Sequence, residues 1–357
     1  MAELIDIGLF RKILEVDSTS GSETALAGLL AEAVPACIGG CTVRMMDVGD
    51  GTVNLLFSRG EPRVVFCTHL DTVPPYIHPA FSEIKAGSGL PDGKTAAGDD
   101  LLITGRGSCD AKGQIISMLG ACRALAANGA EGFALLLVAG EETGSKGAKA
   151  YDRLCREGKA AGAGYLIVGE PTDGKMVTAS KGTAAFKIRI EGKPCHSGYP
   201  SEGISAIDRF VSFMNRLGSV SFPQDGLLGT TTWNAGMLRS DNPRNILSPA
   251  LECELYFRTT FASHSLIEGA LREAAGEGIN IEALGGDMPL EYFTVDGIPK
   301  GPVAFGSDAP HLGAFRNRAI CGAGSILVAH TEREYVLLSE LESAARTYIN
   351  IFEKCWF

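Results

Sequence analysis

The sequence lacks a long basic segment, a membrane-length apolar run and closely paired cysteines. Its 32 Lys and Arg are outnumbered by 42 Asp and Glu, for a formal net charge of −10, which argues against nucleic acid or an anionic membrane as a partner. No apolar stretch approaches the roughly 20 residues needed to cross a bilayer. The start, Met1–Asp6, carries acids where a secretory signal carries bases. Ten cysteines are scattered without a CxxC pair, which predicts buried free thiols in a reducing cytoplasm.

The 357 residues, 45% of them hydrophobic, are enough for two domains. Short apolar runs bounded by Gly or Pro are typical of buried strands in a parallel sheet. Such runs occupy 64–68, 135–139, 165–168 and 325–328, and helical patterns occupy 9–16, 23–33, 113–127 and 334–352. This alternation predicts a three-layer αβα catalytic domain made of residues 1–180 and 288–357.

Between these two parts the pattern changes. Residues 185–190 and 251–258 alternate between apolar and polar side chains, as strands with one solvated face do. Helices are expected at 205–217 and 265–275, and further strands at 231–238 and 280–284. The resulting β-α-β-β-α-β order predicts a ferredoxin-like α+β module, residues 181–287, inserted into the first domain.

Acidic and histidine residues follow the apolar runs. They are His69, Asp71, Glu141, Glu142, Glu170 and His330. Because ligands bind outside the carboxyl ends of parallel strands, we expect these side chains to meet at one edge of the sheet. Taken singly, each has an ordinary explanation: a core histidine, a solvated acid or a turn acid. Their coincidence at strand ends predicts a metal site with a base beside it.

Three details refine this expectation. Two adjacent acids, Glu141 and Glu142, have diverging side chains, so that one can bind a metal while the other takes a proton. A ligating histidine usually donates its other ring N–H to a carboxylate, and Asp71 can serve His69 if the chain bends at 70–72. Asp110 precedes a helix, where it is either a simple N-cap or a bridging carboxylate.

Four ordered motifs give the sequence a family resemblance. His69-Leu70-Asp71-Thr72-Val73-Pro74 and Gly105–Gly113 are followed by Glu141-Glu142-Thr143-Gly144 and Gly169-Glu170-Pro171-Thr172. Together they resemble the M20 family of zinc aminoacylases and peptidases. Within that family, residues 306–310 and 322–326 look most like acetylornithine deacetylase, with succinyl-diaminopimelate desuccinylase as a near relative.

The resemblance implies two zinc ions per subunit, for which cobalt can substitute. Asp110 would bridge them, with His69 and Glu170 on one metal and Glu142 and His330 on the other. Asp71 would orient His69, Glu141 would be the general base, and the Asp110–Ala111 peptide bond would be cis.

The resemblance also makes residues 181–287 a lid and homodimerisation domain. His196 would stabilise the oxyanion in the partner's active site, and Asn245 and Arg258 would hold the substrate carboxylate. An Arg fork suits that task because it binds a carboxylate with two hydrogen bonds.

The expected activity is hydrolysis of the amide bond of a small N-acyl amino acid. An N2-acetyl-ornithine-like compound of arginine biosynthesis is the preferred substrate. The alternatives are an N-succinyl amino acid, such as succinyl-ornithine or succinyl-diaminopimelate, and a dipeptide. A binding protein without activity would be expected to lack a metal ligand or the general base. The sequence contains no GxSxG motif, which argues against a serine hydrolase.

Overall fold

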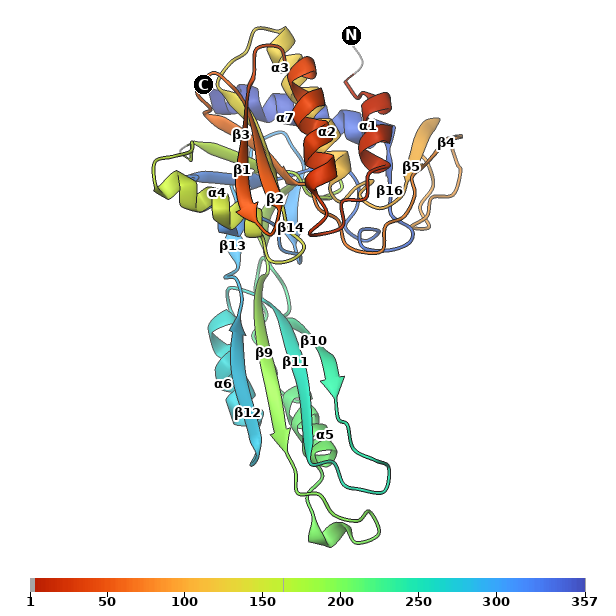
Figure 1. Cartoon of the computed structure of the whole chain (residues 1–357), viewed down its shortest axis with the longest axis vertical. Helices are drawn as coiled ribbons and strands as arrows, with labels where there is room; N and C mark the ends of the chain where they lie inside the picture. The colour runs from red at the N-terminus through yellow and green to blue at the C-terminus, as the bar shows by residue number, and fades with distance from the viewer. Residues whose placement is uncertain (1–3, 163, 357) are drawn as a thin grey trace. The chain divides into compact units, whose positions relative to one another are not determined.

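The computed structural model describes residues 4–162 and 164–356, and their contacts divide the chain into two compact units (Figure 1). Unit 1 contains the described residues of Met1–Thr178, Tyr292–Gly301 and Ser307–Phe357. Unit 2 contains Ala179–Glu291 and Pro302–Gly306.

Helices and strands alternate along the chain, first in the α/β pattern of unit 1 and then in the α+β pattern of unit 2. Up to residue 180 they are α1 (Ile7–Leu14), α2 (Thr24–Cys37), β1 (Thr42–Gly49), β2 (Thr52–Arg59), β3 (Val64–His69), β4 (Ala80–Ile84), β5 (Asp100–Thr104), α3 (Lys112–Ala127), β6 (Phe133–Val138), α4 (Lys146–Arg156), β7 (Tyr165–Val168) and β8 (Met176–Ser180). They continue with β9 (Gly182–Glu191), η1 (Pro200–Glu202), α5 (Ala206–Gly218), β10 (Thr232–Arg239), β11 (Ala250–Thr259), η2 (His264–Leu266), α6 (Ile267–Ala274), β12 (Ile279–Gly285), β13 (Leu290–Glu291), β14 (Lys300–Val303), η3 (Ala309–His311), β15 (Asn317–Ile320), β16 (Tyr335–Leu337) and α7 (Leu338–Trp356).

The central sheet of unit 1 has six strands in the order β1-β2-β6-β3-β7-β15. The strands β6, β3, β7 and β15 run parallel, whereas β1 and β2 are antiparallel to their neighbours. All six residues of β3 and all six of β6 are buried. Burial on both faces explains why these strands are continuous apolar runs in the sequence.

Helices cover both faces of this sheet, which confirms the predicted three-layer α/β fold. Alternate residues of a strand point to opposite faces. Leu55 belongs to the core cluster that also contains residues of α1, α2, α3 and α7. On the opposite face, the amide of Asn54 donates to the carbonyl oxygen of Gly147 in α4 at 2.8 Å.

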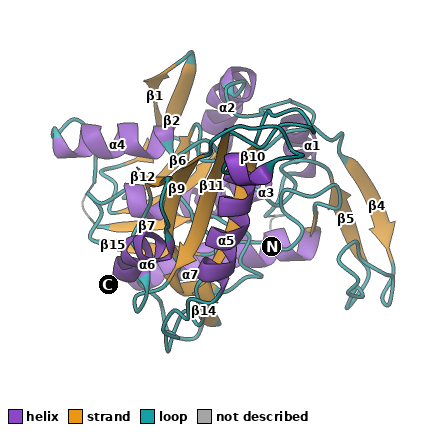
Figure 2. Cartoon of the chain, turned by 90° about the horizontal axis from the view of Figure 1, so that it is seen from below, coloured by secondary structure: helices purple, strands orange, loops and turns teal. Residues whose placement is uncertain are grey.

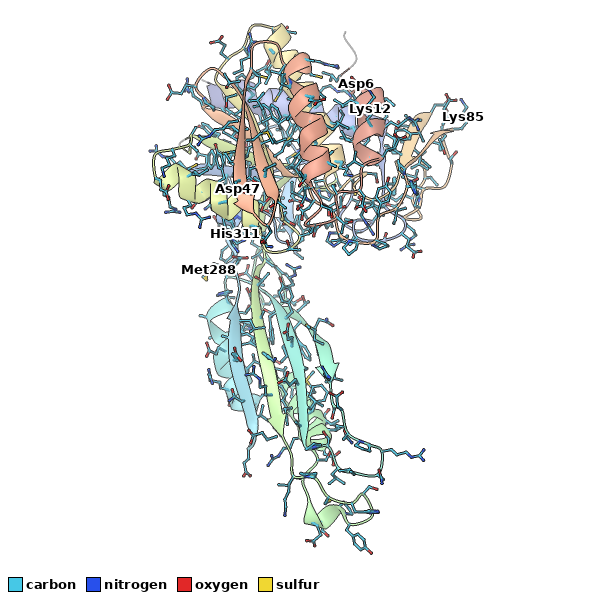
Figure 3. All side chains as sticks on the ribbon, viewed as in Figure 1. Asp6, Lys12, Asp47, Lys85, Met288 and His311 are labelled. Atoms are coloured by element: carbon cyan, nitrogen blue, oxygen red, sulfur yellow. The ribbon has the colours of Figure 1, made fainter. Side chains whose placement is uncertain are left out.

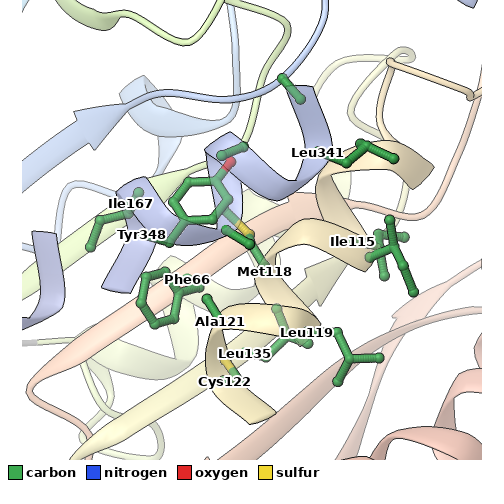
Figure 4. Packing of buried hydrophobic residues seen from close by; sticks show 14 of the residues in the cluster. Phe66, Ile115, Met118, Leu119, Ala121, Cys122, Leu135, Ile167, Leu341 and Tyr348 are labelled. Atoms are coloured by element: carbon green, nitrogen blue, oxygen red, sulfur yellow. The ribbon is translucent and has the colours of Figure 1, made fainter. Parts of the chain in front are cut away.

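The core of unit 1 lies between β3, α3 and α7. Figure 4 shows Phe66, Met118 and Tyr348 from these three elements packing together. The rings of Phe66 and Tyr348 meet edge to face, 5.9 Å between centroids. Full burial of such a side chain contributes about 1.5–3 kcal/mol, so this cluster stabilises the sheet on which the candidate site is built.

A smaller sheet has the order β16-β5-β4, and its strands β5 and β4 are seen on the right of Figure 2. Lys85, just after β4 and labelled in Figure 3, pairs with Asp99 at 2.8 Å beside the start of β5. Asp6, also labelled there, caps α1 by accepting the main-chain N–H of Leu9 at 2.9 Å. A further three-stranded sheet has the order β13-β8-β14.

Unit 2 has the expected β-α-β-β-α-β order. Its four strands are antiparallel in the order β10-β11-β9-β12, the arrangement of a ferredoxin-like fold. Buried residues of β9 and β11, such as Ile188 and Leu255, share one core cluster with Phe213 of α5 and Leu271 of α6. Unit 2 therefore has a core of its own.

Two predicted elements near the C-terminus are wrong. Residues 325–328 form a turn, and Leu327 is 75% exposed; the sheet is completed by β15 instead, whose Asn and Arg hid it from a search for apolar runs. The last helix begins at Leu338 and not at Glu334, because residues 335–337 pair with β5 as β16.

All ten cysteines are free thiols. Four of them lie in the unit 1 core cluster and two more, partly buried, pack against it, as expected for structural residues. Among residues 4–162 and 164–356, no helix combines the length and the apolar character needed to cross a membrane.

Candidate metal centre

The predicted site residues of unit 1 gather where parallel strands end. His69 is the last residue of β3, Glu141 and Glu142 lie shortly after β6, and Glu170 follows β7. Because β6, β3 and β7 are neighbours and parallel, their carboxyl ends share one edge. His330 reaches the same place from a turn, with a left-handed backbone (φ 62°).

His69 is held by the bend that follows its strand. Its Nδ1 lies 2.9 Å from the main-chain oxygen of Asp71 and 3.4 Å from the carboxylate Oδ1 of the same residue. This contact directs Nε2 to Asp110, whose Oδ1 lies 3.1 Å away. Burial lowers the pKa of His69, but its hydrogen bonds with Asp110 and Asp71 outweigh burial and raise the pKa well above its ordinary value.

The Asp71 carboxylate also holds the loop after β6. It accepts the main-chain N–H of Glu141 through Oδ1 at 3.0 Å and that of Glu142 through Oδ2 at 3.1 Å. Ser20 donates its hydroxyl to Oδ2 at 2.8 Å. Burial opposes the charged form, yet the bonds from His69, Ser20 and Glu141 lower the pKa of Asp71.

Asp110 lies between the two histidines. Its Oδ1 faces His69, while its Oδ2 is 3.2 Å from Nε2 of His330. The same nitrogen of His330 is 2.8 Å from Oε1 of Glu142. The Asp110–Ala111 bond is cis, as expected. The N-cap alternative is wrong, because α3 begins at Lys112 with Ala111 in the cap position.

The site carries a large excess of buried negative charge. Burial, followed by the charges of Asp110 and Glu141, raises the pKa of Glu170 well above its ordinary value. Burial likewise raises the pKa of Glu141, with Asp308 and Glu142 adding to the effect. Asp308 is 1% exposed, and burial raises its pKa to about 7. Such a group of acids is stable only if protons or cations neutralise it.

The donor atoms fit a divalent cation. One ligand atom each from His69, Asp110 and Glu142 lie within 4.8 Å of one another, and imidazole and carboxylate are zinc ligands. Ligand atoms of one tetrahedral zinc lie about 3.3–3.6 Å apart, since each is about 2.0–2.2 Å from the metal. The spacings around Asp110, 3.1 and 3.2 Å, are slightly shorter than this. The buried Oε1 of Glu170 has no hydrogen-bond partner among the described residues, and a cation coordinated by this oxygen would compensate its buried charge.

The other predicted residues, His196, Asn245 and Arg258, belong to unit 2. Nδ1 of His196 accepts the main-chain N–H of Gly198 at 3.0 Å, so a neutral His196 carries its proton on Nε2. Asn245 is adjacent, because its main-chain oxygen accepts the N–H of Ser197 at 2.9 Å. Arg258 lies on β11, with its guanidinium 5.1 Å from the ring centroid of Tyr256.

Sequence reasoning missed several residues that surround the candidate ligands. Ser20 binds Asp71, and a buried ion pair between Arg106 and Glu334 lies beside Asp110. Arg106 stands inside the motif 105–113, so an arginine among small residues was the one available signal. Glu334 carried no such signal, because in the sequence it looks like an ordinary polar residue at the start of a helix.

Known proteins are similar to this chain in sequence and in fold. Residues 65–354 match the family described as peptidase family M20/M25/M40. The chain is 30% identical over 355 residues to a peptidase M20 domain-containing protein of Schizosaccharomyces pombe, an alignment that covers 96% of this chain and 82% of that protein. It is 31% identical over 313 residues to a probable carboxypeptidase of Aspergillus oryzae, covering 81% of this chain and 73% of that protein.

Solved structures agree on the fold. The aminopeptidase PepT of Bacillus cereus superposes with a TM-score of 0.76 at 22% identity, over 99% of this chain and all (100%) of that one. A di-peptidase of Saccharomyces cerevisiae superposes with a TM-score of 0.66 at 12% identity, over 96% of this chain and 94% of that one. The sequence match, which spans most of the chain, decides the family: this protein belongs to the M20/M25/M40 peptidases.

Proposed function

We propose that this protein is a hydrolase that uses two zinc ions per subunit to cleave an amide bond, with cobalt able to substitute for zinc. The observation that supports this most directly is the position of Asp110, which turns one carboxylate oxygen to His69 and the other to His330. A carboxylate shared in this way can bridge two cations.

The ligands are assigned to the two positions as the family resemblance implies. His69 and Glu170 would join Asp110 at one cation, and His330 and Glu142, 2.8 Å apart, would join it at the other. When bound, the zinc ions would polarise the scissile carbonyl and make water a stronger acid.

Glu141 is the proposed general base. Its neighbour Glu142 turns to His330, which leaves the Glu141 carboxylate to take a proton from the attacking water and return it to the leaving amine. The main-chain bond from Glu141 to Asp71, at 3.0 Å, fixes the backbone from which the base extends. Asp71 is therefore proposed to position both the base and His69.

Unit 2 is proposed to act as a lid and dimerisation domain, with His196 completing the partner's active site. Nε2 of His196 is suited to donate a hydrogen bond to the oxyanion, since Nδ1 is occupied by Gly198. Asn245 and Arg258 would bind the substrate carboxylate. Exposed apolar side chains on α5 and β10, Val211 (51% exposed) and Met237 (77%), offer a surface for a second copy of the chain.

The substrate proposed first is an N-acyl amino acid, with N2-acetyl-ornithine preferred and N-succinyl amino acids as alternatives. A short peptide cleaved at its C-terminal bond is the second candidate, favoured by curated relatives named probable carboxypeptidase. In both cases the departing amino acid carries a free carboxylate for Arg258. The two candidates therefore differ in the acyl side of the amide bond.

The test combines metal analysis with a substrate panel. The purified protein, stripped of metal and reloaded with zinc or cobalt, is given N2-acetyl-ornithine, N-succinyl-ornithine, succinyl-diaminopimelate, dipeptides and N-blocked dipeptides. We expect metal-dependent release of an amino acid from one of these classes, and the class with the highest kcat/KM identifies the substrate. Equal activity with and without metal would overturn the proposal.

A further inference from the structure

A buried ion pair lies directly behind the candidate metal ligands. Nη1 of Arg106 is 2.6 Å from Oε2 of Glu334, and the two side chains are 2% and 1% exposed. Taking two charges out of water is costly, and an apolar pair of similar size is often as stable. The contacts of this pair indicate what it does.

Glu334 holds the segment that carries Asp110. Its Oε1 accepts the main-chain N–H of Asp110 at 3.2 Å and that of Cys109 at 3.3 Å. These two N–H groups lie just before α3, where no helical partner is available to them. The carboxylate therefore fixes the backbone from which the Asp110 side chain extends toward both histidines.

Arg106 holds the turn that carries His330. The same Nη1 that meets Glu334 also donates to the main-chain oxygen of Thr331 at 3.3 Å, next to His330. Its Nε donates to the main-chain oxygen of Pro75 at 3.2 Å. The His330 backbone is left-handed (φ 62°), a conformation that a side chain with a Cβ disfavours unless its surroundings enforce it.

We infer that Arg106 and Glu334 are positioning residues that set the spacing between Asp110 and His330, and so the affinity of the cation position these two ligands share. Glu334 binds the Asp110 segment and Arg106 binds the His330 turn. Arg106 and Glu334 are 228 positions apart in the sequence, so the ion pair joins two distant segments of the chain. This inference rests on the proposed metal centre.

Zinc titration of the metal-free protein tests it, with a chromophoric chelator as competitor and the cobalt absorption spectrum as a second readout. Glu334→Gln should weaken zinc binding by about 10- to 100-fold, the usual effect of losing an outer partner of a ligand. The larger loss should fall on the equivalent that also uses His330, because Asp110 would be shared by both positions. Arg106→Lys keeps a charge for Glu334 but cannot serve Thr331 and Pro75 together. It should weaken the equivalent that uses His330 to a smaller extent, and it serves as a second variant if Glu334→Gln folds poorly.

Asp152 offers a matched control in unit 1. Its carboxylate also joins an arginine, Arg156 at 2.6 Å, to a main-chain N–H, that of Ala314 at 2.7 Å. Asp152→Asn should lower the melting temperature without changing either zinc affinity. If Glu334→Gln and Arg106→Lys likewise lower only the melting temperature and keep both affinities and the cobalt spectrum, the pair is structural and the inference is wrong. A wild-type protein that binds no zinc would instead overturn the metal centre itself, and this inference with it.

Discussion

Asp71 and Glu141 are joined by a hydrogen bond between a carboxylate and a main-chain N–H, 3.0 Å long, across 70 positions of the sequence. Through the same side chain Asp71 also meets His69, at 3.4 Å. One buried carboxylate thus connects a candidate ligand to the loop of the candidate base. A displacement of the Asp71 carboxylate would therefore displace both His69 and the Glu141 loop.

Asp71→Asn tests this connection. An amide offers one acceptor oxygen where the carboxylate has two, so it cannot accept the N–H groups of both Glu141 and Glu142 in the same way. We expect kcat to fall about 10- to 100-fold, with a weaker affinity for zinc, as for other partners of metal ligands. Steady-state kinetics and zinc titration measure the two effects.

Ser20→Ala is the milder companion of that variant. It removes one donor to Asp71, at 2.8 Å, and leaves the two main-chain bonds in place. Its kcat should remain within a few-fold of wild type. Equal losses in Ser20→Ala and Asp71→Asn would contradict the assigned role of the main-chain bonds.

Glu141→Gln separates the base from the ligands. The amide has the shape of the acid but cannot take a proton, so turnover should drop by about 10²–10⁴-fold while the zinc content stays at the wild-type value. Glu142→Gln is the matched control, because the neighbouring residue contacts His330 and should lose zinc as well as activity. Retained turnover in Glu141→Gln would remove that residue as the base.

Removal of metal should destabilise unit 1. Without a cation the buried carboxylates of Asp110 and Glu170 repel each other, and a ligand present at 100 times its Kd stabilises a folded protein by about 2.7 kcal/mol. Scanning calorimetry of the chelator-treated protein should show a transition that zinc moves several degrees upward. Asp110→Asn should lack that shift, and a wild-type transition indifferent to zinc would count against the site.

His264 should make the stability of unit 2 depend on pH. Its Nδ1 lies 2.7 Å from the hydroxyl of Thr259, and burial lowers its pKa. Above the unfolded-state pKa of about 6.5, His264 is neutral in both states and its contribution to stability is complete. As the pH falls through that value the unfolded chain takes up the proton first, and the contribution is lost.

His264→Gln keeps a side chain that can bind Thr259 but does not titrate. The free energy of unfolding of wild type minus that of the variant, measured by urea denaturation, should decrease between pH 7.5 and pH 5. A difference that is constant or grows over this range would show that the fold does not favour neutral His264.

Much of the fold could be predicted because its central strands are buried on both faces. The runs that became β3 and β6 contain no exposed residue, so composition alone marked them as strands and located the residues at their ends. The strand predicted at 325–328 failed because its three consecutive apolar residues, 326–328, are too few to show a period. Leu327 is exposed there, while the real edge strand, β15, includes Asn317 and Arg318.

Contacts between distant segments could not be read from the sequence. β16 forms only because Tyr335 and its neighbours pair with β5, and local propensity favoured the helix that follows. Glu334 pairs with Arg106, which lies 228 positions away in the sequence, and no local sequence pattern predicts such a pair. Four candidate ligands, His69, Asp110, Glu142 and Glu170, stand in short motifs, whereas the residues that contact them come from wherever the fold brings a complementary group.

The proposed role of His196 in the partner's site can be tested with mixed dimers. His196→Ala alone should lower kcat by about 10²–10³-fold, the loss typical of one oxyanion donor, and Glu141→Gln alone should be nearly inactive. In a dimer of one subunit of each kind, one site combines the intact Glu141 of the first subunit with the intact His196 of the second. Random reassociation makes half of the dimers mixed, each with one complete site, so about a quarter of wild-type activity should return. Val211 lies on the exposed face of α5, so Val211→Asp should give monomers in sedimentation experiments and prevent this recovery of activity. If mixtures of the two single variants stay as inactive as each variant alone, His196 does not act in the partner's site.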